Sequence, residues 1–301
     1  MSYTPKYLEL YEDGELNRRI ELAYKRLEKC DLCPRQCGIN RLKGERGFCR
    51  SGEELMVSSF GPHFGEESEL VGHGGSGTIF LTHCNLKCNF CQNYDISHLG
   101  HGDEISLERL AQMMLQLQDI GCHNINFVTP THFVPQILAS LKEAIEKGLA
   151  LPLVYNCGGY ETLETLKLLE GIIDIYMPDA KFWSPQVAER FAHAPDYPQV
   201  IAETLKEMYR QVGDLIIEKG LAKKGLLVRH LVLPQGLAGT DQIMPFIAKH
   251  LSKDTYVNIM AQYRPLYQAR DDPLINRPIT RREYEEAQEI ARNEGLHRGF
   301  Y

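Results

Sequence analysis

Residues 76–91 read SGTIFLTHCNLKCNFC, and two patterns that decide the fold meet in this stretch. Its first half, 76–83, is a short apolar run that is typical of a buried strand. Its second half places Cys84, Cys88 and Cys91 within eight residues, with the spacing C-x3-C-x2-C. A strand that leads directly into a cysteine-rich loop predicts a metal site at the carboxyl end of that strand.

Further apolar runs follow along the chain and alternate with helical patterns. The runs are 124–129, 151–156, 172–178, 225–234 and 255–263. The helical stretches are 106–121, 134–148, 161–171, a helix opened by Ser184 and Pro185, 198–212, one near 241–251, and a last helix after the capping box of Thr280 and Glu283. Together with 76–83 this makes six strand–helix units, which imply a parallel sheet with right-handed crossovers.

Six units are fewer than the eight of a closed TIM barrel. The pattern therefore predicts an α/β fold, either a partial (β/α)6 TIM-type barrel or a doubly wound sheet. In both folds the functional site lies at the carboxyl ends of the parallel strands. The loop of Cys84 to Cys91 follows the first strand, so it falls at that edge.

The part of the chain before residue 76 has a different texture. Residues 14–29 place apolar side chains at helical spacing, whereas residues 30–75 are rich in Cys and Gly and show little periodicity. We interpret 30–75 as irregular structure held together by a metal. The expected division is an N-terminal helix with a Cys-rich metal-binding segment, 1–75, and a barrel with a C-terminal helix, 76–301.

Composition limits the classes of function. Of 301 residues, 33 are Lys or Arg and 40 are Asp or Glu, so the net charge of −7 argues against a nucleic-acid binder. No apolar run approaches the roughly 18–20 residues that span a membrane. The N-terminal stretch lacks the apolar centre of a secretory signal and resembles no transit peptide. We expect a cytoplasmic protein.

Nine cysteines are many for a reducing compartment, where metal ligation or catalysis is more common than disulfides. Cys30, Cys33, Cys37 and Cys49 are separated by gaps of two, three and eleven residues. Four thiolates with one C-x2-C pair suit tetrahedral zinc or a fully ligated [4Fe–4S] cluster. The spacing leaves both metals open, and with them a structural or an electron-transfer role.

The second group offers only three thiolates. A loop with these gaps can hold three irons of a cubane and leave the fourth iron open, and an open position distinguishes a reactive metal site from a structural one. The alternative is a zinc knuckle, completed by His83 or His98, or a set of free thiols.

The three-cysteine loop, with Phe90 just before its last cysteine, resembles the signature of the radical S-adenosylmethionine (SAM) superfamily. The resemblance implies that Cys84, Cys88 and Cys91 bind a [4Fe–4S] cluster whose fourth iron is chelated by SAM. It further implies that SAM is cleaved reductively to a 5′-deoxyadenosyl radical, which abstracts a hydrogen atom. A low-potential electron donor such as flavodoxin or ferredoxin is then required.

Residues 30–269 are similar to the activating-enzyme branch of that superfamily, the relatives of pyruvate formate-lyase activating enzyme. The resemblance is to a PflX-like subgroup and rests on CDLCPRQCGINR (30–41), GSGTIFLTHCNLKCNFCQN (75–93) and FVTPTHF (127–133). It implies a protein substrate, a glycyl-radical enzyme that receives the radical. Two alternatives stay open: a radical SAM enzyme that acts directly on a small molecule or peptide, and a non-catalytic iron–sulfur or zinc protein.

The resemblance also implies SAM contacts at strand ends. Where activating enzymes carry Gly-Gly-Glu near the SAM amino group, this chain reads Thr129-Pro130-Thr131-His132, so Thr129 and Thr131 replace the carboxylate as hydrogen-bond acceptors. Asn156 falls on an Asn-Gly position. Asp179 and Lys181 match an Asp-x-Lys pattern, with one residue to hold the ribose or ammonium and the other the carboxylate.

Three further residues complete the candidates. Arg229 lies inside an apolar strand, where a charge must be paired if it is buried. Its partner is expected to be either the SAM carboxylate or an acidic residue of the chain. His132 is the best single histidine candidate for a site role, whereas Cys122 and Cys157 are expected to be packed thiols.

Overall fold

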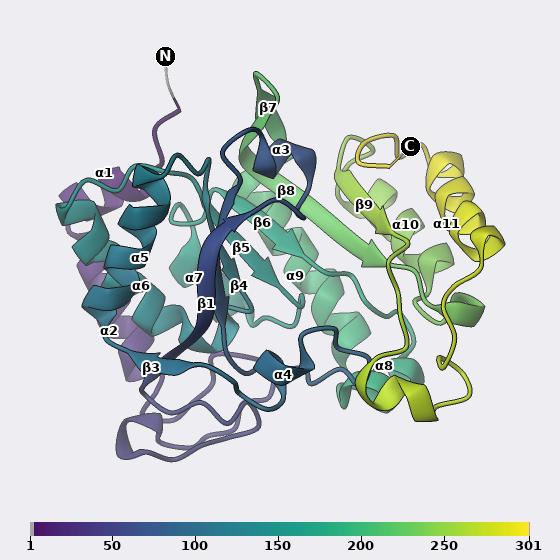
Figure 1. The fold of residues 1–301 in the computed structure, drawn as a ribbon, viewed down its shortest axis with the longest axis horizontal. Helices are drawn as coiled ribbons and strands as arrows, with labels where there is room; N and C mark the ends of the chain where they lie inside the picture. Colours follow the sequence, from purple (N-terminus) through teal and green to yellow (C-terminus); the bar gives the residue numbers. More distant parts are fainter. Residues whose placement is uncertain (1–2, 301) are drawn as a thin grey trace.

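The computed structural model describes residues 3–300, so residues 1–2 and 301 of the two expected parts lie outside the described residues. Its centre is a run of parallel strands that neighbour one another in chain order (Figure 1). These are β2 (Ser76–Leu81), β4 (Ile125–Val128), β5 (Leu153–Cys157), β6 (Ile175–Pro178), β8 (Leu221–Leu231) and β9 (Tyr256–Met260). This arrangement confirms an α/β fold that is consistent with a partial TIM-type barrel.

Helices follow the strands as the periodicity predicts. They are α5 (Leu107–Asp119), α6 (Val134–Glu146), α7 (Leu163–Leu169), α8 (Pro185–Ala192), α9 (Tyr197–Val212), α10 (Thr240–His250) and α11 (Arg281–Asn293). Side-chain caps begin several of them: the Ser106 hydroxyl accepts the Arg109 N–H, and Thr280 with Glu283 forms the predicted capping box. Single turns of 3-10 helix occur at Arg41–Lys43, Thr131–Phe133, Pro234–Gly236 and Tyr267–Asp271.

Alternation along the strands separates two faces of the sheet. On β5, Leu153, Tyr155 and Cys157 pack with the helices in the main core, whereas Val154 belongs to a smaller apolar cluster on the other face. Cys122 is also a core residue, so both isolated cysteines are packed as predicted. Side chains along a barrel strand point alternately toward the helices and toward the barrel interior, so Val154 faces the interior.

The sheet begins before residue 76, which corrects the interpretation of 30–75 as irregular. Strand β1 (Leu55–His63) pairs antiparallel with β2, and β3 (Asp103–Ile105) pairs with β1. A further short strand, β7 (Ile216–Glu218), forms an antiparallel pair with β8. Sequence periodicity misses β1 because it is only partly buried and contains Gly and Pro. Its place comes from backbone pairing with β2.

The N-terminal segment packs against the helical layer. Helices α1 (Tyr7–Glu12) and α2 (Glu15–Lys25) contact α6, and the irregular chain after α2 reaches the edge of the sheet where α4 (Tyr94–Ser97) lies (Figure 1). The short helix α3 (Ser68–Val71) lies at the opposite end, against β8. No helix within residues 3–300 is both long enough and apolar enough to cross a membrane.

Candidate metal centre

The three-cysteine loop leaves the carboxyl end of β2 and folds back on itself. His83 and Lys87 both adopt positive φ, at 66° and 58°, which is uncommon for residues other than Gly and needs surrounding structure to hold it. The Cys84 Sγ lies 3.4 Å from the backbone N–H of Leu86, and the Cys91 Sγ lies 3.1 Å from the Ser97 Oγ. The sulfur atoms are therefore held by local contacts.

Neighbouring elements fix this loop from several sides. The Asn85 side chain donates to the Tyr160 carbonyl at 2.7 Å, and the Asn89 N–H donates to the Phe191 carbonyl at 2.9 Å. The Phe90 ring is buried and makes edge contacts with Phe182 and Tyr263, with each pair of ring centroids 5.9 Å apart. The loop is thus built in advance of any ligand.

The Nε2 nitrogen of His98 is engaged by the backbone and offers no lone pair to a metal held by these cysteines. Its Nε2 lies 3.0 Å from the backbone carbonyl of Cys88, and its ring packs on Tyr267. Because a carbonyl only accepts hydrogen bonds, Nε2 carries the proton in this contact.

The chemistry of the three thiols fits an iron–sulfur cluster. Burial raises the pKa of Cys84, and it raises the pKa of Cys88 to about 12, because a thiolate without a counter-charge is disfavoured there. Bound iron supplies that counter-charge. Within residues 3–300, no three His, Cys, Asp or Glu side chains lie close enough together to hold one single ion. A cubane binds each cysteine through a different iron, so its ligands stand farther apart.

Asp179 and Lys181 lie beside this loop. The Lys181 Nζ is 2.5 Å from an Asp179 carboxylate oxygen, and the two side chains are 18% and 24% exposed. Burial by itself lowers the pKa of Lys181, but the charges of Asp179 and of the nearby Cys88 outweigh it, so the pKa is raised. The structure therefore brings the Asp-x-Lys pair together with the cysteine loop.

The three remaining candidates at strand ends, Thr129, Asn156 and Thr131, have different surroundings. The Thr129 N–H donates to the Asn156 carbonyl at 2.8 Å, and Asn156 shares the inner face of β5 with Val154. Thr131 is fully buried, and its hydroxyl donates to a Glu161 carboxylate oxygen at 2.7 Å. The hydroxyl of Thr131 is thus already engaged within the protein.

Glu161 is a buried acid that sequence reasoning missed. Tyr155 donates to its second carboxylate oxygen at 3.1 Å, and burial raises the pKa of Glu161 to about 7. In the sequence it stands at the start of a helical stretch, where an acidic residue is ordinary. No local signal marks it as buried.

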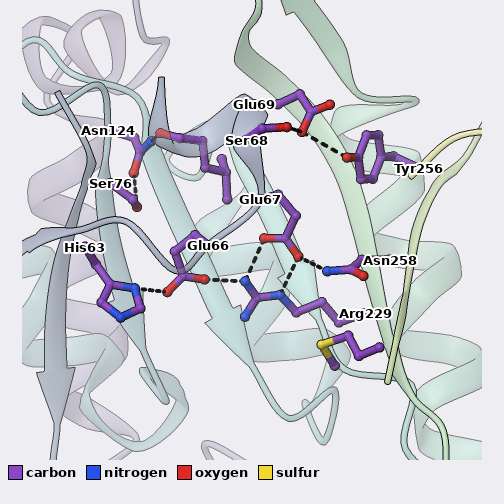
Figure 2. Close-up of polar contacts among 12 residues, drawn as sticks. His63, Glu66, Glu67, Ser68, Glu69, Ser76, Asn124, Arg229, Tyr256 and Asn258 are labelled. Atoms are coloured by element: carbon purple, nitrogen blue, oxygen red, sulfur yellow. Dashed lines mark hydrogen bonds and ion pairs between the residues drawn. The ribbon is translucent and has the colours of Figure 1, made fainter. Parts of the chain in front are cut away.

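Figure 2 shows the surroundings of Arg229, whose guanidinium reaches two carboxylates. It donates to both oxygens of Glu67, at 2.8 and 2.6 Å, and to Glu66. Asn258 on β9 adds a bond to Glu67 at 2.6 Å, and the His63 Nδ1 lies 3.0 Å from Glu66. Arg229 therefore has the acidic partners that the sequence left as the alternative to SAM.

The four remaining clustered cysteines line one pocket. Cys30, Cys33, Cys37 and Cys49 share it with residues that include Arg41 and His132. The Phe48 N–H donates to the Cys37 Sγ at 3.5 Å, and burial raises the pKa of Cys30 and Cys33. The structure brings together all four cysteines that the spacing grouped as a second metal site.

Comparison with known proteins identifies one matching family model and two similar proteins. The model of the Radical SAM superfamily matches residues 78–217. Uncharacterized protein MJ0674 of Methanocaldococcus jannaschii is 35% identical over 299 residues, which cover 96% of this chain and 82% of that protein. Uncharacterized protein MJ0808 of the same organism is 25% identical over 305 residues, covering 92% and 83%.

Among solved structures, HydG, a maturase of the [FeFe]-hydrogenase, is similar with a TM-score of 0.50 and 13% identity. The match covers 74% of this chain and 50% of the HydG chain, so this protein spans about half the length of HydG and shares its fold alone. The superfamily match runs over the strands that carry the cysteine loop, and one relative matches over nearly the whole length. Residues 78–217 of this chain form a radical SAM superfamily domain.

Proposed function

We propose that this protein is an activating-enzyme-like radical SAM enzyme of the PflX-like subgroup, and that its substrate is a protein, a glycyl-radical enzyme. One observation carries the enzymatic part: the loop of Cys84, Cys88 and Cys91 lies at the carboxyl ends of parallel strands together with the Asp179–Lys181 pair. In α/β barrels this edge is where chemistry takes place.

In this proposal each group of residues has a separate role. The three cysteines hold a [4Fe–4S] cluster, which when bound supplies the electron that cleaves SAM to methionine and a 5′-deoxyadenosyl radical. Lys181 and Asp179 offer opposite charges to the zwitterionic end of SAM. Asn156, on the inner face of β5, offers an amide to the same ligand. Phe90 and the apolar residues around it keep water from the loop.

The proposal also includes a second metal, an electron donor and a location in the cell. Cys30, Cys33, Cys37 and Cys49 hold a second metal, zinc or iron–sulfur, because they line one pocket. A low-potential flavodoxin or ferredoxin supplies electrons. The nine free cysteines suit a reducing compartment, which supports the cytoplasm as its place.

A small polar molecule or a peptide is a second candidate substrate, and the interior of the barrel favours it. Arg229, Glu66, Glu67 and Asn258 present a charged network there (Figure 2). These groups are mostly buried and bonded to one another, and the polar character that they give the interior favours a polar ligand of limited size over an apolar one.

The first test is cleavage of SAM. Protein purified without oxygen is reconstituted with iron and sulfide, reduced with dithionite and given SAM, and 5′-deoxyadenosine is measured by mass spectrometry. We expect the product with the intact chain and none with Cys84, Cys88 and Cys91 all changed to Ala. A fully loaded chain that forms no product would leave only a structural or electron-transfer role for the loop.

A second test separates the two substrate classes. A candidate glycyl-radical enzyme is incubated with the loaded protein and SAM, and the glycyl radical is sought by electron paramagnetic resonance (EPR). Formation of the radical supports the protein substrate. If deuterium instead enters 5′-deoxyadenosine from a deuterated small molecule or peptide, the second candidate is the correct one.

A further inference from the structure

We propose that the barrel interior binds a cationic group of the substrate, an ammonium or a guanidinium, through the Glu66 carboxylate and the Nε2 atom of His63. The inference rests on the proposed function for the place of SAM, and it adds the chemical class of the substrate. Three observations support it: an interior that is open toward the carboxyl ends of the strands, an excess of carboxylates at the base of that opening, and hydrogen-bonding atoms that no described residue engages.

The inner face of the sheet changes from packed to open along the strands. Residues opposite each other on parallel neighbours share a face, and every second residue of a strand returns to it. The inner positions toward the amino ends are completely buried: Thr78, Asn126, Val154, Met177 and Leu227. The inner positions two residues farther along are accessible to solvent, Asn156 at 9% and the others more: Phe80, Val128, Asp179 and Arg229. The interior is therefore filled at one end and open toward the cysteine loop.

The segment between β1 and α3 forms the base of the open part. Leu70 of α3 is fully buried and packs with the apolar inner residues toward the amino ends. Glu66 and Glu67 precede α3 and reach Arg229, which belongs to the accessible level (Figure 2). A charged layer thus covers an apolar plug.

The charges in this layer do not balance. Glu67 accepts from Arg229 through both carboxylate oxygens and from Asn258, whereas Glu66 receives a single nitrogen that Arg229 also gives to Glu67. The Glu66 and Glu67 side chains are only 6% and 4% exposed. Two mostly buried carboxylates therefore face one guanidinium, and such an excess of negative charge favours a cationic ligand.

His63 offers a hydrogen-bond acceptor at the same place. Its Nδ1 lies 3.0 Å from a Glu66 oxygen, and its ring makes an edge contact with Phe80, with the centroids 5.9 Å apart. The Glu66 carboxylate only accepts, so Nδ1 carries the proton and Nε2 of the neutral ring bears a lone pair. Within residues 3–300 the only hydrogen bond of the ring is the one to Glu66, and the side chain is 44% exposed. Glu66 thus orients His63 with Nε2 available to a donor.

Asn126 shows that the interior has unmet hydrogen-bonding capacity. It lies on the inner face of β4, one inner position before Val128, and is fully buried. Neither its amide oxygen nor its amide nitrogen has a partner among the described residues. Because buried polar groups are nearly always paired, this amide favours a polar occupant of the interior over an apolar one.

The charged layer lies next to the residues assigned to SAM. The backbone of Asp179 forms a bridge with that of Arg229, and the Ala180 N–H donates to the Arg229 carbonyl at 2.7 Å. A group bound by Glu66 and His63 would therefore lie beside the ligand of the Asp179–Lys181 pair. Such closeness is what transfer of a hydrogen atom between two bound molecules requires.

The test is calorimetry of cluster-loaded protein under anaerobic conditions, with and without SAM. The probes are the blocked tripeptide acetyl-Gly-Lys-Gly-amide, the same peptide with norleucine in place of lysine, and n-butylammonium chloride. We expect the lysine peptide to bind at least about tenfold more tightly than the norleucine peptide, because only lysine brings a positive charge. Binding of the lysine peptide alone would identify a basic peptide segment as the ligand, and binding of butylammonium alone would identify a small amine.

Two variants locate the binding. Glu66→Gln keeps the shape of the side chain but removes its charge, and it should weaken binding of the cation by about tenfold or more. His63→Phe keeps a ring but removes the acceptor, and it should weaken binding less. Glu69→Gln is the matched control, because Glu69 follows on the same segment but bonds to Tyr256 and Ser68, and it should bind like the natural chain. Thermal denaturation confirms that each variant is folded.

Equal affinity for the lysine and norleucine peptides would overturn the proposal, and would mean that His63 itself supplies the balancing charge. Absence of binding by both cationic probes, or unchanged binding in Glu66→Gln, would overturn it as well. These measurements need no cleavage of SAM. A chain that cleaves SAM but binds no cation would refute this inference and leave the proposed function intact.

Discussion

Lys181 and Asp179 form an ion pair beside the cysteine loop that is only partly open to water. Changing Lys181 to Met leaves the Asp179 carboxylate without its counter-charge, so we expect the free energy of unfolding to fall by about 1–3 kcal/mol. The double variant Lys181→Met/Asp179→Asn should recover part of this loss. Chemical denaturation of the natural chain, of Lys181→Met, of Asp179→Asn and of the double variant measures the coupling, and additive losses would show that the pair contributes nothing to stability.

The buried carboxyl group of Glu161 makes the stability of the protein depend on pH. Burial raises its pKa to about 7 in the folded protein, from the usual value near 4.5. Between these two values the folded state binds the proton and the unfolded state does not, so stability falls as pH rises. The expected loss is at most about 1.4 kcal/mol per pH unit across this window.

The measurement is denaturation of Glu161→Gln and of the natural chain from about pH 4.5 to 7.5, which spans the window between the two pKa values. Because glutamine does not titrate, the variant should show a flatter pH profile than the natural chain. Glu164→Gln is the matched control and should keep the natural slope, because Glu164 is exposed and lies in the first turn of α7, which begins just after Glu161. Equal slopes in the Glu161 variant and the natural chain would contradict the burial of a titrating carboxyl.

At the scale of elements, the turn after β5 brings two strand ends together. Gly159 has a φ of +72°, and a Cβ there would lie 2.7 Å from the Asp179 carbonyl and 2.3 Å from Ile201. Only glycine allows β5 to pass this close to the end of β6. The glycine therefore lets the turn after β5 lie against the backbone of Asp179.

Gly159→Ala should accordingly displace the end of β6. We expect a loss of stability of about 1–3 kcal/mol more than in the control, together with weaker SAM binding by the loaded protein. Gly148→Ala is the control, because Gly148 also has positive φ but would place its Cβ in open space. Calorimetry of SAM binding and denaturation measure both effects. Similar losses in the two variants would mean that backbone conformation alone matters.

Elements with strong local signals were predictable, and the others were not. The capping box of Thr280 and Glu283 and the serine cap at Ser106 marked helix starts that the structure confirms. Strand β1 carries no such signal, since its partner β2 supplies the backbone hydrogen bonds that make it a strand. Its absence from the predicted elements follows from that dependence on tertiary pairing.

At the scale of the whole molecule, Arg229 ties the two ends of the sheet to each other. Its bonds to Glu66 and Glu67 connect β8 to the segment between β1 and α3, and Asn258 extends the network to β9 (Figure 2). The attraction of Arg229 outweighs the effect of burial and lowers the pKa of Glu67. The network thus joins the paired strands β8 and β9 to the segment after β1, and β1 is not paired with either of them.

Replacing Arg229 by Leu takes the guanidinium from two buried carboxylates and leaves Glu67 only Asn258, and Glu66 only His63, as a partner. We expect a loss of about 3–5 kcal/mol in the free energy of unfolding. Adding Glu67→Gln to that variant should restore part of it. Arg281→Ala removes an exposed ion pair, with Arg281 88% exposed, and should change stability by less than about 1 kcal/mol. Denaturation compares the variants. A small effect of Arg229→Leu would mean that the carboxylates are open to water.

The sequence by itself determined the strand–helix order, the caps and the position of Cys84, Cys88 and Cys91 after a strand, because each depends on neighbours along the chain. It also grouped the cysteines of the second site. Only the tertiary structure decided the partners of Arg229, the burial of Glu161 and the contact of His132 with the four-cysteine pocket. Each of these depends on residues that are tens of positions apart in the sequence. Their ion pairs, hydrogen bonds and burial exist only once the fold brings those residues together.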